Sequence, residues 1–138
     1  MEEPYVSLTV AKLLKLKGFD LECHHFYYCK NNGEIVEKRM HFVANRNSNR
    51  WINQYAEYVS APTQQMAISW LWKTYNINIV IQFVSESGKC VYNIIHSPFK
   101  MDDISSYPIV FDCHEDAVNA ALEKTLVKLI YDAGRILK

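Results

Sequence analysis

The chain has 138 residues, of which 49% are hydrophobic, and its 15 basic side chains balance 15 acidic ones. This composition excludes a disordered chain, and the length suits one domain with its own core. The zero net charge excludes the positive field that accompanies non-specific binding to nucleic acid or to anionic membranes. We therefore expect a single domain over residues 1–138.

The sequence carries no sign of export or membrane insertion. No apolar run is long enough to cross a bilayer, and the start, Met1-Glu2-Glu3-Pro4, is acidic where a signal peptide is basic. The four cysteines form no CxxC pair, and a domain of this size folds without disulfides. These features predict a cytoplasmic protein with reduced thiols and no membrane partner.

The first expected element is a helix from about Leu8 to Lys17. Ser7 is placed to cap its N-terminus, and Gly18 can adopt the left-handed conformation that ends it. Apolar residues recur within it at helical spacing, which predicts one buried face.

A hairpin should follow this helix. The aromatic run His24–Cys29 is typical of a strand, Asn31-Asn32-Gly33 suits a tight turn, and Glu34–Phe42 forms the return strand. Alternation along the return strand places four residues on one side: Val36, Lys38, Met40 and Phe42. The polar residues from Val43 to Tyr55 lack periodicity and predict an exposed loop.

The second helix should begin near Pro62-Thr63, with Thr63 as its N-cap. Its buried stripe is expected at Met66, Ala67, Trp70 and Leu71. The run Ile77–Phe83 alternates apolar residues and predicts a central strand, and Lys89–Ile95 returns as its hairpin partner.

Two further elements complete the expected fold. Ile109–Phe111 can add a short edge strand. The last helix should start at Asp112, which has capping-box spacing to Glu115, and run to near the end of the chain. Its broad apolar face favours self-association as a homodimer.

The pattern Tyr5-Val6-Ser7 recurs at Tyr58-Val59-Ser60, and each copy is expected to open a helix and a hairpin. The elements predict an α+β fold on an αββ-αββ-α plan. We expect an antiparallel sheet of four to five strands with the helices packed mainly on one face, and its strand order stays open.

Zinc-ligand types gather in the first hairpin at Cys23, His24, His25 and Cys29. Adjacent residues on a strand point to opposite faces, so the two histidines cannot easily hold one ion. We therefore expect these residues to be structural and predict no metal site.

Sequence motifs of catalysis are also missing. Cys113-His114 could form a nucleophile and base at a helix N-terminus, but no oxyanion loop or third group accompanies the pair. The chain has no GxxxxGK[ST], GxGxxG, HExxH or GxSxG motif. We expect no enzymatic activity and no cofactor.

Two binding functions fit the aromatic and basic residues. Tyrosine, tryptophan and arginine are enriched in protein interfaces, and the interface candidates are Tyr27, Tyr28, Trp51 and Tyr55. Cations beside aromatic rings can also hold single-stranded nucleic acid, and the candidates for that function are Lys38, Arg39, Arg46, Arg50 and Trp51. We favour protein contacts because the net charge is zero.

Residues 5–19 and 60–71 resemble a group of small uncharacterised proteins encoded in gut-bacterial genomes, often within prophage-like or mobile elements. In that group a glutamate tends to replace Met66 and a serine lies near Cys113, so this chain lacks two of the group's capping residues. The resemblance implies no activity, cofactor or catalytic residue.

These observations predict a non-enzymatic accessory protein of a phage or mobile element that acts through protein contacts or self-association. The alternative is single-stranded nucleic-acid binding through Lys38–Trp51. A cysteine-based enzyme or a metal site remains a third hypothesis.

Overall fold

The computed structural model describes residues 3–51, 54–84, 89–96, 99–100 and 110–136. Its helices are α1 (Leu8–Leu16), α2 (Gln64–Tyr75) and α3 (His114–Ile136). Its strands are β1 (Cys23–Lys30), β2 (Ile35–Ala44), β3 (Ala56–Ser60), β4 (Ile77–Phe83), β5 (Cys90–His96) and β6 (Phe99–Lys100), and a short 3-10 helix, η1 (Asn49–Trp51), precedes β3. The predicted α+β class is confirmed.

The strands form two separate antiparallel sheets, ordered β2-β1-β3 and β4-β5-β6. The prediction of one sheet with four to five strands is therefore wrong. The first hairpin pairs with the unpredicted strand β3, in which Tyr58 lies opposite Tyr28, and does not pair with the second hairpin. Consequently β4, expected at the centre of a sheet, lies at the end of its sheet's strand order, and β5 is central.

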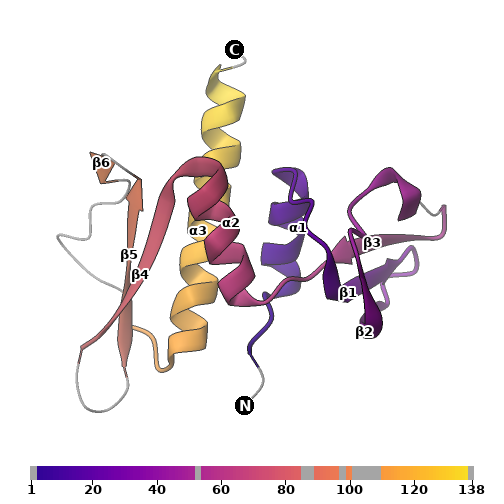
Figure 1. Cartoon of the computed structure of the whole chain (residues 1–138), viewed down its shortest axis with the longest axis horizontal. Helices are drawn as coiled ribbons and strands as arrows, with labels where there is room; N and C mark the ends of the chain where they lie inside the picture. The colour runs from indigo at the N-terminus through magenta and orange to yellow at the C-terminus, as the bar shows by residue number, and fades with distance from the viewer. Residues whose placement is uncertain (1–2, 52–53, 85–88, 97–98, 101–109, 137–138) are drawn as a thin grey trace.

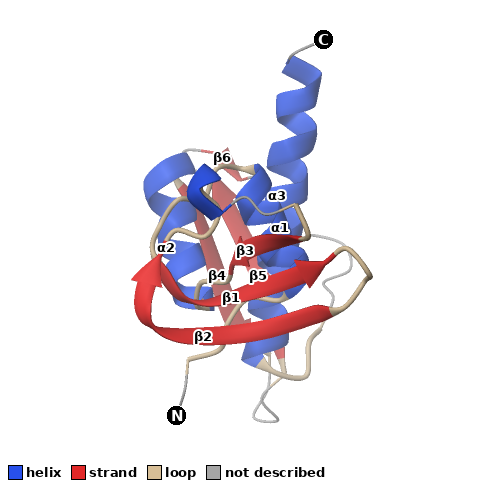
Figure 2. Ribbon diagram, turned by 90° about the vertical axis from the view of Figure 1, so that its right-hand side faces the viewer, coloured by secondary structure: helices blue, strands red, loops and turns tan. Residues whose placement is uncertain are grey.

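The helices form a layer between the two sheets (Figure 1). We expected the helices to pack mainly on one face of a single sheet, and the structure instead places them between two sheets (Figure 1). Each sheet buries one face against this layer, because the apolar side of a strand pair must be removed from water. The other face of the first sheet points away from the helices, and Figure 2 looks onto it, with β1 and β2 in front.

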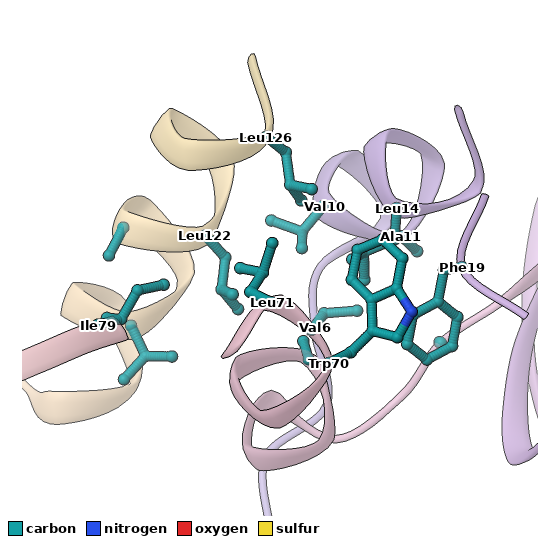
Figure 3. Close-up of a cluster of buried hydrophobic side chains, with 14 of the residues drawn as sticks. Val6, Val10, Ala11, Leu14, Phe19, Trp70, Leu71, Ile79, Leu122 and Leu126 are labelled. Atoms are coloured by element: carbon teal, nitrogen blue, oxygen red, sulfur yellow. The ribbon is translucent and has the colours of Figure 1, made fainter. Parts of the chain in front are cut away.

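The core lies where the three helices meet (Figure 3). Leu14 of α1, Leu71 of α2 and Leu122 of α3 have no exposed surface, and Phe19 packs edge-on against Trp70 at 5.4 Å between ring centroids. Complete burial of one such leucine contributes about 1.5–3 kcal/mol. The helices therefore join the two sheets through one continuous apolar cluster.

The predicted helix starts of α1 and α2 are confirmed. The backbone N–H of Val10 donates to Ser7 Oγ at 3.3 Å, and that of Met66 donates to Thr63 Oγ1 at 3.1 Å. Both caps satisfy a backbone donor that the helix leaves without an internal partner. Gly18 follows α1 with a φ of +87°, a conformation that favours glycine.

The two recurring Tyr-Val-Ser segments adopt different structures. Tyr5-Val6-Ser7 leads directly into α1, whereas Tyr58-Val59-Ser60 belongs to β3 and does not open α2. The segments preceding the two helices lie beside each other, since the Val6 N–H donates to the Pro62 carbonyl at 3.0 Å. The expected plan thus holds in outline, with an added strand after each hairpin.

The edge strand and the helix start predicted before α3 differ from the structure. Ile109 lies outside the described residues, and Phe111 forms an isolated bridge with Cys90 in place of a strand. The helix α3 begins at His114, one residue later than a cap at Asp112 requires. None of the described helices combines the length and the apolar character needed to span a membrane.

Candidate functional site

The segment between β2 and β3 is held against the first sheet by its own polar side chains. Asn47 donates through Nδ2 to the Phe19 carbonyl at 3.0 Å and accepts the Ser60 N–H at 2.9 Å. The Arg46 N–H donates to Ser60 Oγ at 2.9 Å. The predicted exposed loop is thus partly buried, and these bonds place Arg46 and Trp51 over the open face of the sheet.

Side chains alternate between the two faces of the first sheet. Tyr27 and Val59 pack toward the helices, whereas Phe26, Tyr28 and Tyr58 occupy the opposite, open face. The Tyr58 ring lies 5.7 Å from Phe26, 4.9 Å from Tyr28 and 5.4 Å from Trp51. Tyr58 is therefore the centre of an aromatic cluster that three chain segments build.

This cluster forms the floor of a hollow of about 290 Å³, which we call the aromatic hollow. Its lining residues are Phe26, Tyr28, Lys38, Met40, Phe42, Arg46, Trp51 and Tyr58. Two of these side chains are cationic and none is acidic. The hollow therefore combines planar apolar walls with positive charge.

Arg46 lies inside the cluster, with only 1% of its surface exposed. Its Cζ atom is 4.3 Å from the Phe26 ring centroid and 5.1 Å from those of Phe42 and Trp51, distances typical of cation–π contacts. Nη1 donates to the Cys23 carbonyl at 2.8 Å, but Nε and Nη2 have no hydrogen-bond acceptor among the described residues. Burial lowers the pKa of the Arg46 guanidinium.

The four interface candidates lie in different parts of the structure. Tyr28 and Trp51 line the aromatic hollow. Tyr27 lies on the helix side of β1, where its hydroxyl donates to the Val6 carbonyl at 3.0 Å. Tyr55 is 68% exposed and lies outside the lining. The four residues therefore do not form one surface.

The nucleic-acid candidates also lie partly inside and partly outside the aromatic hollow. Lys38 joins Trp51 in the hollow, with its Nζ 5.9 Å from the Tyr28 ring centroid. Arg46 is also in the lining, but it is buried and so is not the exposed cation that was expected. Arg39 lies opposite His25 in the sheet register, and exposed Arg50 of η1 is outside the lining.

Sequence reasoning missed Phe26, Met40, Phe42 and Tyr58 as site residues. The alternation along β2 already places Met40 and Phe42 on the side of Lys38, so that signal was present in the sequence. Tyr58 was missed because Tyr58-Val59-Ser60 was interpreted as the start of a helix, whereas it forms the strand β3.

The cysteine and histidine side chains of the first hairpin do not point toward one common site. His24 is exposed, with Nδ1 3.0 Å from the Met40 carbonyl oxygen, whereas His25 is buried on the other face. The Cys23 thiol is buried, which raises its pKa to about 12 although the Arg46 charge opposes that shift. Within the described part of the chain, no three histidine, cysteine or acidic side chains are placed to hold a metal ion.

The other catalytic hypothesis involved Cys113-His114. Cys113 is exposed just before α3, and the His114 ring stacks on Phe83 at 6.4 Å between centroids. That contact places the imidazole against an aromatic ring of β4.

A second polar feature lies on the helix side of β1. The His25 ring stacks on Tyr5 at 4.0 Å, and its Nε2 lies 2.8 Å from Glu37 Oε1. Its Nδ1 is buried without a hydrogen-bond partner among the described residues. A protonated ring would leave this N–H unsatisfied, and burial lowers the pKa of His25 even though Glu37 opposes the shift.

This environment makes stability depend on pH. The unfolded chain takes up a proton at the ordinary histidine pKa of 6.5, whereas the folded chain takes it up at lower pH. The stabilisation is therefore present above pH 6.5 and is lost as the pH falls through the lowered pKa. We expect the free energy of unfolding, measured with urea, to decrease in that range.

The matched variants for this experiment are His25→Phe and His24→Gln. His25→Phe keeps a ring against Tyr5 and should flatten the pH dependence below 6.5. His24→Gln alters an exposed neighbour and should retain the dependence. Equal pH dependence in both variants would exclude His25 as its source.

Comparison of the chain with protein-family models, with curated proteins and with solved structures gives no match.

Proposed function

We propose that this protein is a non-enzymatic accessory protein that binds a segment of another protein in the aromatic hollow. The observation that carries the proposal is the hollow itself, an open group of aromatic side chains with two cations and no acid in its lining. Tyrosine, tryptophan and arginine are the residues that contribute most to protein interfaces. Such a site binds by contact and needs no catalytic group.

The exposed rim of the hollow fits a protein ligand. Met40 and Phe42 of β2 are 38% and 50% exposed, so binding would remove their apolar surface from water. The more central rings, those of Phe26 and Tyr58, are already ordered by their contacts with each other. Binding therefore costs little further side-chain entropy at the centre of the site.

The proposal can be tested without knowing the natural partner. Peptides selected from a random display library on the purified protein are measured by fluorescence anisotropy against the wild type and two variants. Tyr28→Ala removes a ring from the hollow, whereas Tyr55→Ala removes an exposed ring outside it. Circular dichroism confirms that each variant retains its helices.

We expect Tyr28→Ala to weaken peptide binding by about tenfold or more, as truncation of an interface hot spot does. Tyr55→Ala should leave the affinity unchanged. Selected peptides that bind both variants as tightly as the wild type would exclude the hollow as the binding site.

Single-stranded nucleic acid is the second candidate ligand. It is favoured by the Lys38 ammonium near the Tyr28 ring and by the lack of acids in the lining. It is disfavoured by the burial of Arg46, which leaves Lys38 as the exposed cation of the hollow. An oligonucleotide affinity that falls with salt and is lost in Lys38→Ala would place this candidate first.

A further inference from the structure

We infer that Arg46 binds a carboxylate of the partner segment through its Nε and Nη2 atoms. The inference rests on the proposed function, since it names the chemical group that the aromatic hollow recognises. The ligand class is a peptide that carries a carboxylate next to an apolar side chain. The carboxylate can belong to aspartate, to glutamate or to a chain terminus.

The hydrogen bonds already made by Arg46 define the free edge of its guanidinium. Nη1 is occupied by the Cys23 carbonyl at 2.8 Å, whereas Nε and Nη2 have no acceptor within the described part of the chain. Nε and Nη2 share one edge of the planar group, and their parallel N–H bonds match the two oxygens of a carboxylate. The unused edge is therefore a pair of parallel donors that can bind one carboxylate through both of its oxygens.

The unpartnered donors of Arg46 make the unliganded protein less stable, so binding of an anion is favoured. A buried donor without a partner costs free energy, and the cost is larger where the group is charged. Contacts with aromatic rings offset part of the charge's desolvation, but they supply no acceptor in the guanidinium plane. A carboxylate would satisfy both donors and neutralise the cation.

The position of the guanidinium is fixed before any ligand arrives. Phe26 stacks beneath it, and the Arg46 backbone N–H is anchored to Ser60 Oγ at 2.9 Å. Preorganised donors bind more tightly because little freedom is lost on binding. The inference requires the Phe42 ring, which is 50% exposed and 5.1 Å from Cζ, to move aside when the ligand binds.

A carboxylate fits these surroundings better than a phosphate. The guanidinium lies among the flat faces of aromatic rings, and a planar carboxylate can lie in its plane. A phosphate is tetrahedral and carries further oxygens that need donors, but the hollow offers only Lys38 as a second cation. Charge and shape together therefore favour an acidic peptide over a phosphodiester.

The test follows the Arg46 Nε–H resonance of the ¹⁵N-labelled protein by NMR. Sodium acetate, sodium phosphate or sodium chloride is added at constant ionic strength and constant pH. Through-bond correlation to the Arg46 side chain assigns the resonance in the wild type, so the result does not depend on the folding of a variant. Arg46→Lys, where it folds, removes the resonance and verifies the assignment.

We expect a saturable downfield shift with acetate and none with chloride. A saturable shift with phosphate alone would overturn the carboxylate assignment in favour of a phosphodiester ligand. The absence of a saturable shift with either anion would overturn the anion site altogether. The proposed function would survive both of these outcomes if selected peptides still lose affinity in Tyr28→Ala.

A second readout uses the selected peptides. Replacing their acidic residues with the matching amides should weaken binding to the wild type by about tenfold or more, the loss expected of a charge-assisted hydrogen bond. An equal loss of affinity in the wild type and in Arg46→Met would show that the carboxylate is recognised elsewhere.

Discussion

Replacing Leu122 with alanine should lower the free energy of unfolding by about 3 kcal/mol, within the range measured for buried leucines. Leu122 has no exposed surface and lies on α3 where the three helices meet (Figure 3). Truncation leaves a cavity in the layer that joins the two sheets, and rigid neighbours cannot fill it. Urea unfolding of the purified variant measures the change.

The matched control is Val127→Ala on the same helix. Val127 is 50% exposed, so its truncation should change the free energy of unfolding by less than about 0.5 kcal/mol. Similar losses for Leu122→Ala and Val127→Ala would contradict a core centred between the helices.

Replacing Arg46 with alanine should destabilise the protein by about 3 kcal/mol, a loss comparable to that of a large core residue. The side chain fills the space between the rings of Phe26, Phe42 and Trp51, and its Nη1 satisfies the Cys23 carbonyl. Alanine removes both contributions. Thermal and urea unfolding should report the same ranking of wild type and variant.

Arg46→Met provides the sharper comparison. Methionine keeps much of the volume and removes the two unpartnered donors, but it also removes the Nη1 donor of the Cys23 carbonyl. We expect Arg46→Met to be destabilised less than Arg46→Ala, because the space between the rings stays filled, and to lose binding of acidic peptides. A large destabilisation by methionine would mean that Arg46 serves mainly to hold the fold.

The local structure of the chain was largely predictable from the sequence. Ser7 and Thr63 cap their helices as expected, and β4 spans the predicted Ile77–Phe83. These features depend on neighbouring residues, whose hydrogen bonds and periodicity are visible in a short window. Alternation along β2 also placed Lys38, Met40 and Phe42 on one side.

The pairing of distant segments was not predictable in this way. The strand β3 is only five residues long, and its role depends on the register between Tyr58 and Tyr28. Arg46 was expected in solvent because it lies in a polar segment without periodicity, which predicts an exposed loop. Its burial depends on rings from β1, β2 and η1, which come together only in the folded chain.

The most direct test is to map the binding of a selected peptide by the backbone amide spectrum of the ¹⁵N-labelled protein. The expected shifts lie in β1, β2 and β3 and in residues 45–51, around the open face of the first sheet (Figure 2). Shifts concentrated in α3 or in the second sheet, with Phe26 and Trp51 unchanged, would contradict the aromatic hollow as the binding surface.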